Sequence, residues 1–235
     1  MKKRVLLLPI SGLLGSAVRN LYDECAGGKL QDAFPNLKVA CIGTPFPNAP
    51  FPLLDAKHLL RDPEAQVIRS WSRMIEFGFA SLEPAILKGA DIVICRRLGL
   101  DIVLFASACQ KWNTEVMHDG KLTTQGQRAM DWHHIMVRRF LNGELGIRVP
   151  DAYILPMAQN GDGERILFDT FPDLKNLPPQ VVHNFLERKK QIIEAYFDPA
   201  TGQNQPLIVD AMKPANVMLK DVIDFIRRLR EVHPQ

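Results

Sequence analysis

Residues 4–21, Arg4-Val-Leu-Leu-Leu-Pro-Ile-Ser-Gly-Leu-Leu-Gly-Ser-Ala-Val-Arg-Asn-Leu21, join an apolar run, a turn with two glycines and the start of an amphipathic segment. This order predicts a buried strand, a turn and the first turns of a helix. Such a turn can close around phosphate groups, because small residues let backbone N–H groups reach an anion at the positive end of the helix. We therefore expect a phosphate-binding loop formed by Ser11, Gly12, Gly15 and Ser16.

The turn departs from the common phosphate-loop motif G-x-x-x-x-G-K-[ST]. Gly12 and Gly15 are too close together, and Gly15 is followed by Ser16 and Ala17, so the lysine is missing. Arg19, one turn into the helix, is the nearest substitute, but an arginine is bulkier and starts from a different backbone position. From the turn alone, a phosphate-binding loop and an ordinary strand-to-helix connection both stay open.

The composition predicts one soluble domain over residues 1–235. The chain is 46% hydrophobic and 23% charged, which allows a sizeable core. A formal charge of +3 with scattered basic residues does not indicate a nucleic-acid partner. No segment is long and apolar enough to indicate a membrane span, and the four cysteines form no C-x-x-C pair, so we expect a cytoplasmic protein with free thiols and no metal site.

Apolar runs alternate with amphipathic segments along the whole chain. Strands are expected within residues 4–10, 37–42, 91–95, 150–156 and 206–210, and helices within 16–24, 63–87, 100–112, 123–141, 179–197 and 217–232. This alternation predicts an α/β fold, a five-stranded parallel sheet with helices on both faces in three layers. Ligands of such sheets bind at the carboxyl ends of the strands, which share one edge.

Two further sets of side chains are assigned structural positions. Trp71, Phe77 and Phe79 have the spacing of core residues on a long helix. His133 and His134 point in different directions on a helix, so partly buried or surface histidines are favoured over a metal or acid–base pair.

Several stretches resemble the thymidylate kinase family of P-loop nucleoside monophosphate kinases, over nearly the whole chain. They are Arg69-Ser-Trp-Ser-Arg73, Glu83-Pro-Ala-Ile-Leu-Lys-Gly89, Asp91-Ile-Val-Ile-Cys-Arg-Arg97 and Leu207-Ile-Val-Asp-Ala211. The resemblance implies a P-loop NTPase-type fold that uses ATP and Mg²⁺ to phosphorylate a (deoxy)nucleoside monophosphate such as dTMP. It also implies a homodimer formed through helices such as those near residues 63–87 and 100–112.

The resemblance also implies roles for individual residues. Arg73 would face the monophosphate, Arg97 would hold its phosphate, and Arg165, in a lid over residues 158–178, would swing over the transferring phosphoryl group. The loop after the second strand, with Thr44 and Phe46, would approach the acceptor nucleotide. Phosphoryl transfer needs such cations, because catalysis depends on positioning and on neutralising negative charge.

The departures from the family pattern lie at the positions that carry the chemistry of phosphoryl transfer. The loop lysine is absent, Ser11 stands where the family usually has an acidic residue, a phenylalanine or its neighbour replaces the arginine of the second-strand loop, and Arg96 replaces the acid before Arg97. One donor in a preorganised site is worth roughly 3 kcal/mol, so several losses should be severe. The alternative is therefore a catalytically impaired homologue with a regulatory or protein-interaction role.

Overall fold

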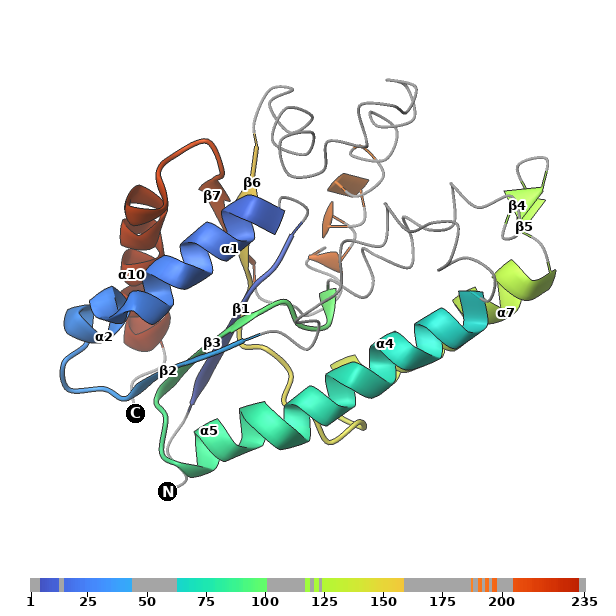
Figure 1. Cartoon of the computed structure of the whole chain (residues 1–235), viewed down its shortest axis with the longest axis horizontal. Helices are drawn as coiled ribbons and strands as arrows, with labels where there is room; N and C mark the ends of the chain where they lie inside the picture. Colours follow the sequence, from blue (N-terminus) through green and yellow to red (C-terminus); the bar gives the residue numbers. More distant parts are fainter. Residues whose placement is uncertain are drawn as a thin grey trace.

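The computed structural model describes residues 5–12, 15–43, 63–100, 117–118, 121–122, 124–158 and 205–232, together with 187, 190–191, 193–194 and 196–197. Five strands form one parallel sheet in the order β2-β3-β1-β6-β7 (Figure 1). Their bounds are β1 Leu6–Ile10, β2 Val39–Ile42, β3 Ile92–Arg96, β6 Ile154–Met157 and β7 Leu207–Asp210. The predicted α/β class and the five parallel strands are confirmed.

The helices follow the strands in the predicted alternation. Their bounds are α1 Gly15–Glu24, α2 Leu30–Ala33, α4 Pro63–Phe77, α5 Glu83–Leu87, α7 Thr124–Leu141 and α10 Ala215–Val232, with π-helical turns η1 at Cys25–Lys29 and η2 at Gly78–Leu82. Within the described ranges, none of these helices combines the length and the apolar composition that crossing a lipid bilayer requires.

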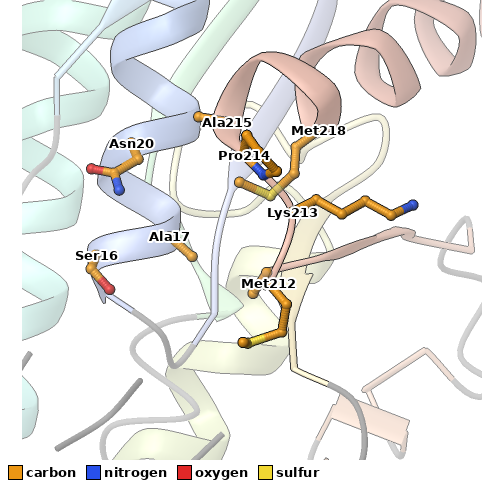
Figure 2. A pocket seen from close by; sticks show the side chains of 9 residues that line it. Ser16, Ala17, Asn20, Met212, Lys213, Pro214, Ala215 and Met218 are labelled. Atoms are coloured by element: carbon orange, nitrogen blue, oxygen red, sulfur yellow. The ribbon is translucent and has the colours of Figure 1, made fainter. Parts of the chain in front are cut away.

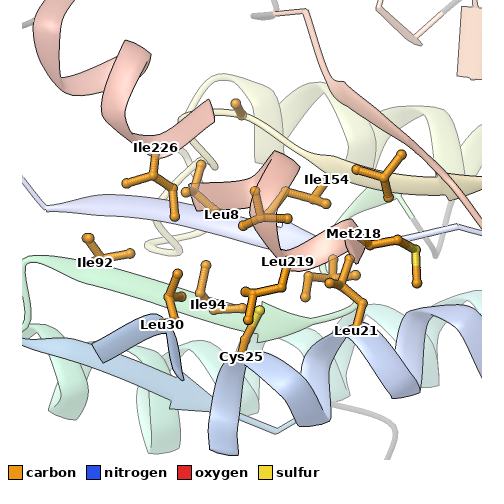
Figure 3. Packing of buried hydrophobic residues seen from close by; sticks show 14 of the residues in the cluster. Leu8, Leu21, Cys25, Leu30, Ile92, Ile94, Ile154, Met218, Leu219 and Ile226 are labelled. Atoms are coloured by element: carbon orange, nitrogen blue, oxygen red, sulfur yellow. The ribbon is translucent and has the colours of Figure 1, made fainter. Parts of the chain in front are cut away.

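Alternation along the strands produces two separate cores, one on each face of the sheet. Leu8, Ile94 and Ile154 point to the face covered by α1 and α10, where they meet Leu21 and Leu219 (Figure 3). The opposite face is covered by α4, α5 and α7. Its core is built from the other strand residues and the buried sides of these helices: Leu7, Val93, Cys95, Trp71, Met74, Phe77 and Phe140.

Two aspartates fix the amino ends of the strands. The Asp91 carboxylate accepts a hydrogen bond from the backbone N–H of Lys38 at 2.8 Å, and the Asp151 carboxylate accepts one from the backbone N–H of Leu7 at 2.8 Å. β1 then pairs with β3 along its full length, and Ile10 pairs with Ile154 of β6. The carboxyl ends of β1, β3 and β6 therefore meet at one edge.

The structure differs from the sequence prediction in three places. The first helix does not end near residue 24 as expected; it passes into η1 and α2, and Gly28 absorbs the kink with a φ of 94°. A short hairpin of β4 (Met117–His118) and β5 (Lys121–Leu122) was not predicted, because two-residue strands leave no readable alternation. Phe79 is 58% exposed, so its prediction as a core residue was wrong, whereas Trp71 and Phe77 are buried.

Candidate functional site

The turn after β1 lies at the carboxyl edge of the sheet, between β3 and β6. The backbone N–H of Ser11 donates to the carbonyl of Ile154 at 2.9 Å, which ties the turn to β6. Gly12 has a φ of 133°, a conformation that residues with a Cβ rarely adopt. The chain therefore turns sharply here, and Gly15 begins α1.

The first turn of α1 offers backbone N–H groups and small side chains. Ser16 is partly buried and Ala17 is buried, whereas Arg19 is exposed. This first turn contains no acidic residue that would neutralise the positive end of the helix. The turn is suited to an anion on electrostatic grounds.

Ser11 is a buried polar residue without a local role. Its side chain is fully buried, and its hydroxyl has no hydrogen-bond partner among the described residues. A buried hydroxyl without a partner is costly, so such groups in a native fold call for an explanation. A ligand at the carboxyl edge would supply one.

A pocket of about 290 Å³ separates α1 from the loop between β7 and α10 (Figure 2). Ser16, Ala17 and Asn20 form the α1 wall. The opposite wall consists of the loop and the start of α10: Ala211, Met212, Lys213, Pro214, Ala215 and Met218. The lining is mainly apolar, with a hydroxyl, an amide and an ammonium group; Figure 2 shows the Lys213 side chain extending away from α1.

Two helices begin at this pocket. α1 contributes its first turn, and α10 begins with Ala215, directly after Pro214. The first turn of α10, like that of α1, has no acidic residue. Asp210, at the end of β7, accepts a hydrogen bond from the backbone N–H of Met212 at 3.0 Å, which shapes the loop. The pocket thus combines apolar walls with two positive helix ends.

Arg97 lies at the carboxyl end of β3, beside the β1 turn. Its backbone N–H donates to the carbonyl of Ile10 at 3.0 Å, one residue before Ser11. It is the one non-glycine residue with positive φ in the described part of the chain, at 66°. Its side chain is partly buried, and its Nε atom is shielded from solvent.

Arg96 points to the face covered by α1, like Ile94 two residues before it, as strand alternation predicts. Its guanidinium carbon lies 5.8 Å from the centroid of the Tyr22 ring on α1, within cation–π range. Burial raises the pKa of Tyr22 to about 12, so the ring stays neutral beside the cation. Arg96 therefore stabilises the contact with α1.

The structure brings some of the predicted residues together and leaves others apart. Ser11, Gly12, Gly15, Ser16 and Arg97 lie around the carboxyl edge near β1. Arg73 is exposed on α4, and the structure shows no role for it at this edge. Thr44, Phe46 and Arg165, with residues 159–178 of the predicted lid, lie outside the described residues.

The described residues form no cage of several side chains that would hold a metal ion without a ligand. No three His, Cys, Asp or Glu side chains cluster as metal ligands would within the part of the chain that the structure describes. Mg²⁺ in phosphoryl-transfer sites is held by one or two protein groups together with the phosphates of the nucleotide. Among the described residues of the pocket, the hydroxyl of Ser16 is the group that could serve in this way.

Sequence reasoning missed Asn20, the loop after the last strand with Met212 and Lys213, and Met218 in the first turn of α10. A usable signal was present, since Pro214 follows a predicted strand and precedes a predicted helix, which places this loop at the carboxyl edge of the sheet.

No family model matches the chain, and no curated protein matches it either.

Proposed function

We propose that the protein binds a nucleotide at the carboxyl edge of its sheet and acts as a thymidylate kinase-like nucleoside monophosphate kinase, with ATP as the phosphate donor. The observation that carries the proposal is the pocket between the first turns of α1 and α10. Its apolar walls suit the flat face of a nucleobase, and the two positive helix ends suit phosphate groups.

A second group of residues supports an anionic ligand. Arg97 lies beside the β1 turn, and the buried hydroxyl of Ser11 has no hydrogen-bond partner among the described residues. A guanidinium can hold two phosphate oxygens at once, which fixes a phosphate in direction as well as in place. The proposal assigns the acceptor phosphate to Arg97 and the donor nucleotide to the pocket beside α1.

A second candidate function is a binding protein that no longer transfers phosphoryl groups and serves a regulatory or protein-interaction role. The phosphate loop has no lysine, because Ser16 and Ala17 follow Gly15. The described residues also hold no cluster of metal ligands. Both losses remove charge that would stabilise a transferring phosphoryl group.

The experiment that separates these functions incubates the pure protein with ATP, MgCl₂ and each of dAMP, dCMP, dGMP and dTMP. Thermal shifts report binding, and production of nucleoside diphosphate reports turnover. Turnover supports the kinase, and binding without turnover supports the regulatory protein. The absence of both, across the four monophosphates and ATP, contradicts nucleotide binding in either candidate and leaves only a protein-interaction role.

A further inference from the structure

The segment Arg97-Leu98-Gly99, which follows β3, is held by several elements at once. The backbone N–H of Arg97 bonds to β1, Leu98 is fully buried, and the backbone N–H of Gly99 points at the sulfur of Met74 on α4 at 3.3 Å. Gly99 is itself buried. This segment is therefore buried like the residues of the hydrophobic core, although it lies at the carboxyl edge of the sheet.

Both the limited space around residue 99 and its backbone conformation require a glycine at this position. Its φ is 56°, and a Cβ at this position would lie 2.6 Å from Cε1 of Phe140 and 2.9 Å from the hydroxyl of Tyr153. Phe140 belongs to α7 and Tyr153 immediately precedes β6, and both are about 1% exposed. Neither ring can easily move away, because protein interiors are close-packed.

Arg97 takes up a left-handed conformation two residues earlier, with a φ of 66°. That conformation is unfavourable for a residue with a Cβ, and glycine would adopt it without strain. Strained residues of this kind persist where the surrounding structure imposes them, and they concentrate at functional sites. The surrounding contacts here are those of Leu98 and Gly99.

We infer that Gly99 is a positioning residue for Arg97: its close packing against Phe140 and Tyr153 holds the strained segment so that the Arg97 guanidinium is presented to the phosphate of a nucleoside monophosphate. The inference rests on the proposed function, because it assigns Arg97 the acceptor phosphate. Gly99 touches no ligand and acts through the direction in which Arg97 leaves the sheet. Met74 also helps to hold the segment in place, because its sulfur accepts a hydrogen bond from the backbone N–H of Gly99.

The test measures affinity for dAMP, dCMP, dGMP and dTMP by isothermal titration calorimetry in wild type, Arg97→Ala, Gly99→Ala and the double variant. We expect each single variant to weaken binding of the preferred monophosphate by about 10- to 100-fold, the value of a hydrogen bond to a charged group. In the Arg97→Ala background, Gly99→Ala should cause no further loss, because the residue it positions is gone.

The matched control is Gly89→Ala. Gly89 also has a positive φ, 85°, but a Cβ there meets nothing within 4 Å. This variant carries the backbone strain without displacing Arg97, so its affinity should equal that of wild type. If Gly99→Ala fails to fold, Met74→Leu removes the sulfur at nearly constant volume, and it should weaken binding only while Arg97 is present.

Stability gives a second readout, which tests the backbone strain at Arg97 on which the inference depends. Arg97→Gly and Arg97→Ala lose the same charge, but only glycine relieves the strain, so we expect Arg97→Gly to unfold about 2–4 °C above Arg97→Ala. The inference is overturned if Gly99→Ala, or Met74→Leu in its place, binds like wild type, if the losses of the two sites add, or if Arg97→Gly melts no higher than Arg97→Ala. A wild-type protein that binds none of the four monophosphates overturns the acceptor assignment of the proposed function, and the inference with it.

Discussion

His133 makes the stability of the protein depend on pH. Its ring is 1% exposed between α7 and α4, and the indole N–H of Trp71 donates to its Nδ1 at 3.3 Å. Burial, and secondarily the charge of His134, lowers the pKa of His133 from 6.5 to about 4. Folding therefore requires the neutral ring, with Nδ1 as the acceptor.

The sign and size of the effect follow from this lowered pKa. Stability is fully present above the unfolded pKa of 6.5 and is lost as pH falls from there toward 4. A difference of this size corresponds to about 3 kcal/mol when the loss is complete, and to about 2 kcal/mol between pH 7.5 and pH 5. The proton binds the unfolded chain first, so acid favours unfolding.

The assay is urea unfolding followed by circular dichroism at several pH values between 7.5 and 5. His133→Gln removes the titration and keeps a neutral acceptor for Trp71, so its free energy of unfolding should fall by about 2 kcal/mol less than that of wild type over this range. His134→Gln is the matched control, because His134 is exposed and its loss should leave most of the pH dependence. Parallel curves for wild type and His133→Gln would refute the reasoning.

Three further predictions concern single side chains, each checked by urea unfolding at pH 7.5. Ser11→Ala should leave the free energy of unfolding unchanged or raise it by about 1 kcal/mol, because it removes a buried hydroxyl that has no partner among the described residues; a clear loss would contradict this. Leu21→Ala should cost about 2–5 kcal/mol, since Leu21 is fully buried beneath α10, whereas Leu87→Ala, at an 81% exposed position, should stay within about 0.5 kcal/mol. Asp151→Ala should cost about 1–3 kcal/mol by leaving the backbone N–H of Leu7 unpaired, and an unchanged midpoint would argue against that role.

The sheet could be predicted from the sequence because each strand can be recognised from the pattern of its own residues. Apolar runs such as those of β1 and β3 are buried on both faces, and the amphipathic helices between them leave only a parallel arrangement. The glycine turn after β1 and Arg97 after β3 could be placed at one edge for the same reason.

The rest of the site depends on contacts that no local pattern encodes. The pocket opposite Ser16 is formed by Met212 and Pro214, almost two hundred residues further along the chain. The importance of Gly99 arises from the rings of Phe140 and Tyr153, which come from other elements. Periodicity likewise assigned Phe79 to the core, but the π-helical turn η2 begins at Gly78 and interrupts the helical spacing.

The most direct test of nucleotide binding at the carboxyl edge places a negative charge at the start of α1. Ser16→Glu puts a carboxylate where the phosphates would lie, and an acidic residue in the first turn favours the helix, so the fold should persist. Thr124→Glu, at the first residue of α7 and outside the pocket lining, is the matched control with the same charge change. By isothermal titration calorimetry, wild type and Thr124→Glu should bind ATP with equal affinity, and Ser16→Glu should bind it at least about tenfold more weakly. Equal affinity of Ser16→Glu and wild type, or no binding of ATP by wild type, would contradict the account.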